Sequence, residues 1–245
     1  MDIQGLKDKI LQLAIQGKLV EQDKNDEPAS VLLQRIKEER DKLVKEKKIK
    51  KQKPLPEVTD EEKPFEIPGS WEWVRLGEVL YVKRGASPRP IKKYLTDDVS
   101  GVNWIKIGDA TDGGKYITSV NQRITPEGAK KSVYLKSGAL VMSNSMSFGK
   151  AYILGIDGCI RDGWLSFEFN KDYLEAELLQ FFLSASYIVF DRVAVGTGVR
   201  NLNIDRVRTT LIPLPPLAEQ KRIVEKVDMI MGILDKLEKE LIINI

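Results

Sequence analysis

Apolar residues recur at a helical spacing at the start of the chain. Four of them follow one another at intervals of 3, 4 and 3 residues: Ile3, Leu6, Ile10 and Leu13. This spacing places them on one face of a helix, as in the seam of a coiled coil. The pattern predicts a helix over residues 1–20 that ends near Gly17. A second amphipathic stretch predicts a helix from about Pro28 to Lys48.

The apolar repeat at the C-terminus is stricter. Six residues follow one another at intervals of 4, 3, 4, 3 and 4: Ile223, Val227, Ile230, Leu234, Leu237 and Leu241. Lys and Glu alternate on the other faces of this predicted helix. So narrow an apolar stripe favours pairing with one partner helix, and packing of the helix on its own domain is the alternative. We expect both terminal seams to take part in dimerisation.

Three prolines directly precede the C-terminal helix, at positions 213, 215 and 216. Proline fixes φ and cannot continue a helix beyond its first turn. The prolines therefore predict a stiff, extended arm that directs the helix away from the preceding domain.

The middle of the chain changes character. Residues 65–211 hold all four tryptophans and most glycines, and short apolar segments alternate there with Gly, Asp and Asn turns. This pattern predicts strands, interrupted by one amphipathic helix from about Asp172 to Val193. We therefore predict an α+β fold, in which one globular domain (65–211) of mixed strands and helices is flanked by long coiled-coil helices. The flanking segments are 1–50 and 212–245, and residues 51–64 read as a charged linker.

Composition excludes much chemistry. The 245 residues include no histidine, so the chain holds no Ser-His-Asp triad, no H-E-x-x-H metal site and no histidine base. The single cysteine, Cys159, cannot form an internal disulfide, and no apolar run approaches 18 residues. A cytoplasmic protein that does not cross a membrane is the expected class.

Positive charge is concentrated in one region. Residues 83–150 hold 12 Lys/Arg against 5 Asp/Glu, a net of +7, whereas the whole chain has a net charge of +3. A basic surface with polar side chains on Gly- and Pro-containing loops is typical of DNA binding, although a solvated lysine-rich surface would look the same. The candidate DNA-binding residues are Lys83, Arg84, Ser87, Arg89, Lys106, Lys115, Asn144, Ser145, Lys150 and Arg200.

Two enzymatic interpretations find little support. The Pro215-Pro216 pair lacks the preceding polar and following aromatic residue of an amino-methyltransferase motif. Glu61-Glu62-Lys63 resembles part of a nuclease motif but lies in the charged linker. Clustered Cys and His ligands for a structural metal are missing from the sequence. We therefore predict a binding protein with no catalytic residues and no metal site.

Several segments resemble the specificity subunits of type I restriction-modification systems. The C-terminal segment LIPLPPLAEQKRIVEKVD is similar to a conserved region of that family. GVRNLNIDRVR resembles the segment that closes a target recognition domain, and IPGSWEWVRLGEV resembles the segment that opens one. The N-terminal segment LQLAIQGKLVEQDKNDEPASVLLQRIKEER resembles the segment that follows a spacer helix. Two more resemble recurrent pieces inside such domains: WIKIGDA and SMSFGKAYILGIDGCIRDGWLSF.

The resemblance implies a DNA-recognition subunit without an active centre or cofactor of its own. In the family, two recognition domains are held apart by two conserved helices, and each reads half of a split site in double-stranded DNA. Modification subunits that use S-adenosylmethionine and restriction subunits that use ATP and Mg²⁺ dock on it.

This chain departs from the family pattern because it has one recognition domain. Its N-terminal segment also resembles what would follow its own C-terminal helix. The order favours a half-subunit that pairs with a second copy and reads an interrupted palindrome. A fragment of a two-domain subunit, or a coiled-coil DNA-binding scaffold, remains the alternative.

Overall fold

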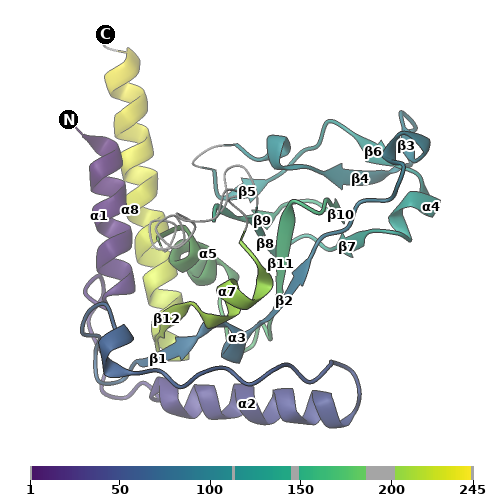
Figure 1. The fold of residues 1–245 in the computed structure, drawn as a ribbon. Helices are drawn as coiled ribbons and strands as arrows, with labels where there is room; N and C mark the ends of the chain where they lie inside the picture. The colour runs from purple at the N-terminus through teal and green to yellow at the C-terminus, as the bar shows by residue number, and fades with distance from the viewer. Residues whose placement is uncertain (1, 112–113, 145–148, 186–201, 244–245) are drawn as a thin grey trace. The chain divides into compact units, whose positions relative to one another are not determined.

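The computed structural model describes residues 2–111, 114–144, 149–185 and 202–243. The chain divides into two compact units. Unit 1 comprises residues 1–79, 170–185 and 209–245, and unit 2 comprises residues 80–169 and 186–208. The predicted recognition domain of 65–211 therefore does not coincide with unit 2, since both of its ends and its internal segment 170–185 belong to unit 1. Figure 1 shows the elements of both units.

Unit 1 is mainly helical. Its helices are α1 (Ile3–Ile15), α2 (Ala29–Lys45), α3 (Leu76–Val79), α5 (Ala176–Ala185) and α8 (Leu217–Ile243). A short 3₁₀ helix, η1 (Asp60–Glu62), and a two-stranded antiparallel sheet of β1 (Glu72–Arg75) and β12 (Leu211–Leu214) complete it. The helices predicted at both ends and after Pro28 are confirmed. Residues 186–193 of the helix predicted at 172–193 lie outside the described residues.

Helix α1 begins and ends at recognisable signals. The Asp2 side chain accepts a 2.8 Å hydrogen bond from the amide of Gly5, which satisfies one free N–H of the first turn. Gly17 follows the helix with φ of +67°, a left-handed conformation that glycine adopts without strain. These two residues set the length of the helix.

Helices α1 and α8 lie side by side and antiparallel (Figure 1). Lys7 of α1 forms ion pairs of 2.7 and 2.8 Å with Asp235 and Glu238 near the end of α8. Further along, both helices join α5 in one core, in which the buried residues are Ala14, Trp71, Leu178, Phe181, Phe182, Ile223, Val224 and Val227.

This packing corrects the expectation for the C-terminal helix. Ile223 and Val227, the first two seam residues, are fully buried within the chain itself. The first turns of the helix thus pack on its own unit. The narrow apolar stripe had favoured a separate partner helix, so this part of the expectation was wrong. Of the other predicted seam residues, Ile3 and Leu234 are buried, Ile10, Leu13, Ile230 and Leu237 are half-buried, and Leu6 and Leu241 are exposed.

The proline segment is likewise not a free arm. Residues 211–214 form β12, which pairs with β1 so that Pro213 lies opposite Trp73. Pro213, Pro215 and Pro216 are buried. A two-stranded sheet leaves each strand one unpaired edge, where the missing N–H of a proline costs no ladder hydrogen bond. The prolines therefore dock the start of α8 on unit 1.

The charged segment 51–64 is held in place by one arginine. The buried guanidinium of Arg75 donates to the carbonyl oxygens of Pro56, at 2.8 Å, and Glu57, at 2.9 Å. It also lies 2.7 Å from the carboxylate of Glu62 and 2.9 Å from the carbonyl oxygen of Thr209. The segment that reads as a linker is thus anchored to unit 1.

Unit 2 consists of two five-stranded sheets. The first has the order β3-β6-β4-β10-β7, and its strands are Leu95–Thr96, Arg123–Ile124, Val102–Ile105, Gly158–Ile160 and Val133–Leu135. The second has the order β2-β11-β8-β9-β5, and its strands are Tyr81–Arg84, Trp164–Glu168, Leu140–Ser143, Ala151–Leu154 and Tyr116–Ile117. Short helices lie between or after them: η2 (Ile91–Lys93), η3 (Ile107–Asp109), α4 (Pro126–Ala129) and α7 (Ile204–Thr209).

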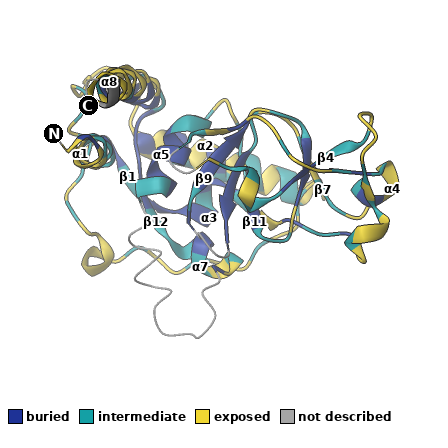
Figure 2. Ribbon diagram, turned by 90° about the horizontal axis from the view of Figure 1, so that it is seen from above, coloured by how far each residue is buried: buried dark blue, intermediate teal, exposed yellow. Residues whose placement is uncertain are grey.

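The second sheet supplies most of the main core of unit 2, which also includes Ile105 and Ile160 of the first sheet. Strands β8 and β9 are buried at every residue, and Figure 2 shows β9 and β11 largely buried. Trp164 packs edge-on against Tyr152, with ring centroids 5.9 Å apart. The apolar runs that predicted strands in the sequence are these buried strands, so the α+β class is confirmed.

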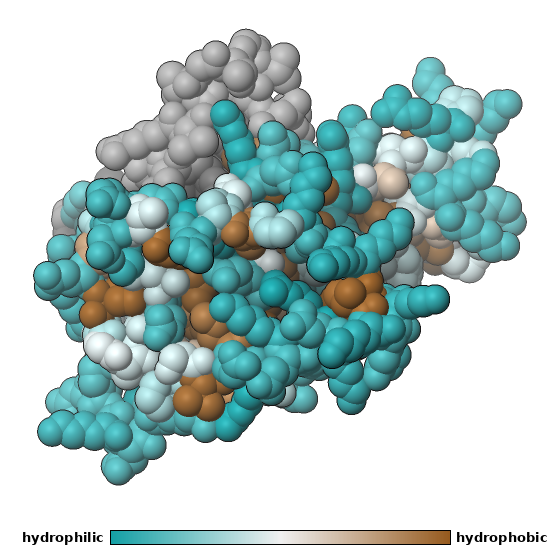
Figure 3. Space-filling model, turned by 60° about the horizontal axis from the view of Figure 1, so that its bottom comes forward, coloured by the Kyte–Doolittle hydropathy of each residue, from teal (hydrophilic) through white to brown (hydrophobic). Residues whose placement is uncertain are grey.

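One face of the molecule is seen in Figure 3. On the face seen in Figure 3, hydrophilic side chains predominate and apolar ones lie in small separate patches. Among the described residues, no helix has both the length and the apolar composition needed to span a bilayer.

Candidate nucleic-acid interface

Two cations follow two neighbouring parallel strands of unit 2. Strands β4 and β10 pair in parallel, with Ile105 opposite Ile160. Lys106 and Arg161 are the next residues, and the amide of Arg161 donates to the carbonyl oxygen of Ile105 over 3.2 Å. Because parallel strands end at the same edge of a sheet, the two cationic side chains start next to each other.

The segment after β2 lies against this same edge. The amide of Gly85 donates to the carbonyl oxygen of Trp164 over 2.8 Å, and that of Ala86 to Ile160 over 3.3 Å. A Cβ atom at position 85 would lie 2.0 Å from the carbonyl oxygen of Arg161, so only glycine fits there. This contact brings the loop at 86–90 beside the cations that follow β4 and β10.

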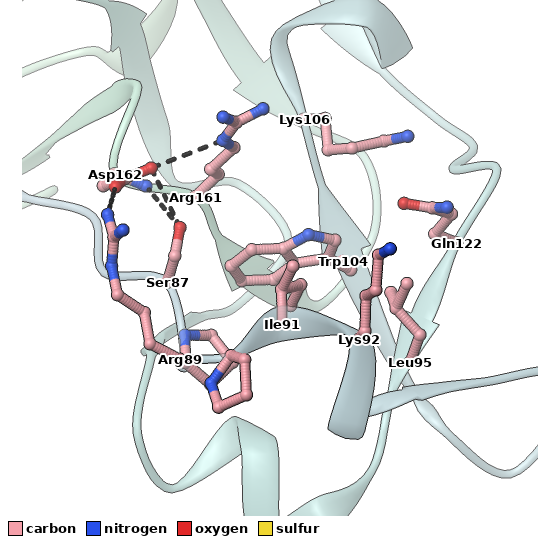
Figure 4. Close-up of a pocket in the computed structure, with 12 residues that line it drawn as sticks. Ser87, Arg89, Ile91, Lys92, Leu95, Trp104, Lys106, Gln122, Arg161 and Asp162 are labelled. Atoms are coloured by element: carbon pink, nitrogen blue, oxygen red, sulfur yellow. Dashed lines mark hydrogen bonds and ion pairs between the residues drawn. The ribbon is translucent and has the colours of Figure 1, made fainter.

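These segments surround a hollow of about 750 Å³ within unit 2. Figure 4 shows Trp104 in its middle, flanked by the apolar side chains of Ile91 and Leu95. Polar and charged side chains stand around them, and those that line the hollow are Ser87, Arg89, Lys92, Lys106, Gln122, Arg161 and Asp162. Four cations against one carboxylate make it a basic, partly apolar surface, as binding to a sugar-phosphate backbone requires.

Asp162 links the two segments that form one side of the hollow. Its carboxylate accepts hydrogen bonds from the Ser87 hydroxyl at 2.9 Å and from Arg89 at 3.1 Å. It also lies 3.3 Å from Nε of Arg161. Its carbonyl oxygen accepts a 3.0 Å hydrogen bond from Nε of Arg84. Figure 4 shows the contacts of the carboxylate as dashed lines.

The pKa of Asp162 lies below its ordinary value. Partial burial acts to raise it, but the hydrogen bond from Ser87 and the positive charges of Arg161 and Arg89 together lower it by more. The carboxylate is therefore ionised at neutral pH and neutralises part of the surrounding positive charge.

Comparisons with known proteins show the family of the chain. The profile of the type I restriction modification DNA specificity domain matches residues 68–245, which include the whole hollow. The chain belongs to this family.

Two family members from Escherichia coli are related over nearly the whole chain. The EcoAI specificity subunit is 35% identical over 261 residues, which cover 96% of this chain and 41% of that subunit. The EcoEI specificity subunit is 32% identical over 255 residues, which cover 98% of this chain and 42% of that subunit. The chain thus spans about two fifths of the length of these relatives.

Solved structures of the family share the fold. The HsdS subunit from Thermoanaerobacter tengcongensis superposes with a TM-score of 0.59 at 23% identity, over 86% of this chain and 50% of that one. A second structure, from a study of complex assembly and conformational transition of the type I R-M system, gives a TM-score of 0.60 at 23% identity over 86% of this chain and 51% of that one.

Three of the ten candidate residues predicted from the sequence line the hollow: Ser87, Arg89 and Lys106. Arg84 contacts its edge through Asp162. Lys83 forms a 2.7 Å ion pair with Glu168 on the neighbouring strand, and it does not line the hollow.

The remaining candidates lie elsewhere in unit 2 or outside the described residues. Lys115 lies 5.6 Å from the ring centroid of Tyr116. Asn144 is 2% exposed, so its side chain is not part of the surface. Lys150 is half-buried and accepts a hydrogen bond through its carbonyl oxygen from Ser143. Ser145 and Arg200 fall outside the described residues.

The sequence interpretation missed four polar or charged residues of the hollow, namely Lys92, Gln122, Arg161 and Asp162. The sequence contained a pattern that could have indicated Arg161. This residue directly follows the apolar strand GCI, in the same way that Lys106 directly follows the strand VNWI. The parallel pairing of these two strands, which brings both residues together, is not visible in the sequence. Gln122 precedes a strand of two residues, which is too short to recognise.

Proposed function

We propose that the chain is the DNA-recognition component of a type I restriction-modification system and that unit 2 contacts double-stranded DNA through the hollow. The observation that carries the proposal is the ring of four cations and one glutamine around an apolar floor. Lysine and arginine neutralise phosphates, and glutamine and arginine also hydrogen-bond base edges. Family membership supports the same function.

The proposed role is recognition without catalysis. The sequence has no histidine, and among the described residues no cluster of three metal-ligating side chains is present. Methylation, with S-adenosylmethionine, and cleavage, with ATP and Mg²⁺, then fall to separate modification and restriction subunits that dock on this chain in the cytoplasm.

A salt titration tests the proposal. Binding of the full chain to a 30-base-pair duplex of mixed sequence is measured by fluorescence anisotropy at increasing salt concentration. Each phosphate contact contributes about −0.9 to the slope of log K against log salt. The triple variant Arg89→Ala, Lys92→Ala and Lys106→Ala should flatten the slope by about 3 units if all three residues contact phosphates. An unchanged slope would show that the hollow does not contact DNA.

Lys136→Ala is the matched control. This lysine belongs to unit 2, pairs with Asp157 at 2.8 Å and does not line the hollow. Its loss removes one positive charge from the same unit. The slope of the control should equal that of the unmodified chain within error.

We also propose that the chain reads one half of a bipartite site and pairs with a second copy. Support comes from four exposed apolar residues of α1 and α8: Leu6, Met229, Ile233 and Leu241. In a two-domain subunit that contained this chain, the second recognition unit would cover these residues instead. Light scattering on the purified chain distinguishes a dimer from a monomer.

A further inference from the structure

Arg161 is held at one end of its guanidinium only. Nε lies 3.3 Å from Oδ1 of Asp162, whereas Nη1 and Nη2 have no hydrogen-bond partner within the described part of the chain. The side chain is 57% exposed. Figure 4 shows both terminal nitrogens on the side that faces away from Asp162. Two adjacent N–H donors are thus presented at the wall of the hollow.

Asp162 fixes this orientation because its carboxylate is itself held from two directions. Ser87 donates to Oδ1 at 2.9 Å and Arg89 to Oδ2 at 3.1 Å, so both oxygens are engaged by the loop that Gly85 brings close. An arginine whose orientation is set before binding loses less conformational entropy when it meets its ligand. Asp162 is therefore a positioning residue for Arg161.

The local charge balance separates Arg161 from the lysines of the hollow. Arg161 and Asp162 form an ion pair, so together they add little net attraction for phosphate. Lys92 and Lys106 have no acidic partner within 4 Å among the described residues and remain full positive charges. A paired arginine keeps the shape of its two terminal donors, and a planar pair of N–H groups matches O6 and N7 of guanine.

Resting on the proposed function, we infer that Arg161 is a specificity-determining residue that reads the major-groove edge of a guanine, with Asp162 as the residue that positions it. The lysines then supply affinity that does not depend on sequence, and Arg161 supplies the discrimination. This division makes opposite predictions for variants of the two kinds of residue.

The experiment is a selection from a random duplex library. The full chain, together with the modification subunit of its own system, is bound to 30-base-pair duplexes with random sequence, and the retained duplexes are sequenced. Arg161→Ala and Arg161→Lys should each relax one G·C position of the selected motif, with a loss of discrimination of about 5- to 150-fold. Lysine keeps the charge but lacks the two parallel donors, so it should not restore the preference.

Asp162→Asn gives a second, independent readout. It removes the negative charge while it keeps the shape of the side chain. Preference for guanine at that position should fall, and affinity for random duplex should rise several-fold because one acidic group is lost from the hollow. Loss of a merely structural contact would lower both. Thermal unfolding of each variant verifies that unit 2 remains folded, and Lys136→Ala is the control that should leave the motif unchanged.

Three results of these experiments decide between the inference and its alternatives. Relaxation of one G·C position in both supports the inference. An equal loss of binding to all duplexes in Arg161→Ala, restored in Arg161→Lys, would show a phosphate contact and overturn it while the proposed function stands. If the unmodified chain enriches no sequence and its binding does not depend on salt, the proposed function and this inference both fail.

Discussion

Nε1 of Trp71 donates a 2.8 Å hydrogen bond to the buried carboxyl group of Glu219, although the two residues are 148 positions apart in the sequence. Gln22 donates to the other carboxyl oxygen. The N-terminal loop, the segment before β1 and the first turn of α8 therefore meet at one buried acidic group. This contact joins the parts of unit 1 that the sequence places at its two ends.

Glu219→Ala should destabilise unit 1 by about 1–3 kcal/mol, because it leaves the buried indole N–H of Trp71 without an acceptor. Glu219→Gln keeps an acceptor oxygen and should cost less. Urea unfolding followed by tryptophan fluorescence measures both. Equal stability of the alanine variant and the unmodified chain would contradict the proposed role of this contact.

The pH dependence of unit 1 follows from the same residue. Burial raises the pKa of Glu219 above its ordinary 4.5, and the hydrogen bonds from Trp71 and Gln22 offset part of the rise. The folded chain then holds the proton to higher pH than the unfolded chain does. The contribution of Glu219 to stability is fully present below pH 4.5 and is lost as the pH rises through the raised pKa. Relative to Glu219→Gln, the unmodified chain should lose stability as the pH rises above 4.5 and through the raised pKa of Glu219. Parallel curves of the two proteins would contradict the shift.

Gly85→Ala should disrupt the hollow. Its Cβ would lie 2.0 Å from the backbone of Arg161, so the loop at 86–90 must move away. We expect a destabilisation of about 1–3 kcal/mol and loss of sequence-specific DNA binding. Gly108→Ala is the matched control within unit 2, because a Cβ there has no neighbour within 4 Å. Equal behaviour of the two variants in binding and unfolding assays would refute the role of the Gly85 contact.

Pairing of two copies is best tested at exposed positions. Ile233 is 58% exposed, so Ile233→Lys should leave unit 1 folded and abolish association with a second copy. Val227→Lys, by contrast, places a charge in the core between α1, α5 and α8 and should unfold unit 1. Light scattering at tens of micromolar, with circular dichroism for folding, separates the two effects. A monomer before any substitution would exclude the pairing.

A dimer also predicts the form of the DNA target. Two identical recognition units related by a twofold axis read the same half-site in opposite directions. In a system whose specificity protein is this chain alone, the methylated sequence should be an interrupted palindrome. Sequencing that detects methylated adenine tests this, and two unrelated half-sites would contradict the dimer.

Local patterns in the sequence predicted the elements well, and long-range pairing set the limits. The repeat at 223–241 correctly predicted a helix, but it could not show that α1 and α5 of the same chain cover its first turns. A strict seam is equally satisfied by a helix from within the chain. The prolines before this helix suggested a free arm because proline is found in strands only at unpaired edges, so the segment did not read as a strand. Its partner strand β1 lies far away in the sequence, so the pairing was not visible either.

The candidate interface was predicted in part for the same reason. Charge density located the basic region, and the loop with Ser87 and Arg89 was recognised from its Gly and Pro residues. Arg161 was not predicted because it lies outside the basic region 83–150. Only the parallel pairing of β4 and β10 brings it next to Lys106. Asn144 was expected at the surface, yet a polar residue at the end of a buried strand is equally suited to the interior.

The most direct measurement of the central claim is hydrogen–deuterium exchange of the full chain with and without a saturating 30-base-pair duplex. If DNA lies on the hollow, backbone amides at 86–95, 105–107 and 160–163 should exchange more slowly in the complex. Amides at 133–138, which do not line the hollow, should exchange at the same rate in both states. Slower exchange elsewhere in unit 2, with no change in the three segments of the hollow, would contradict the claim.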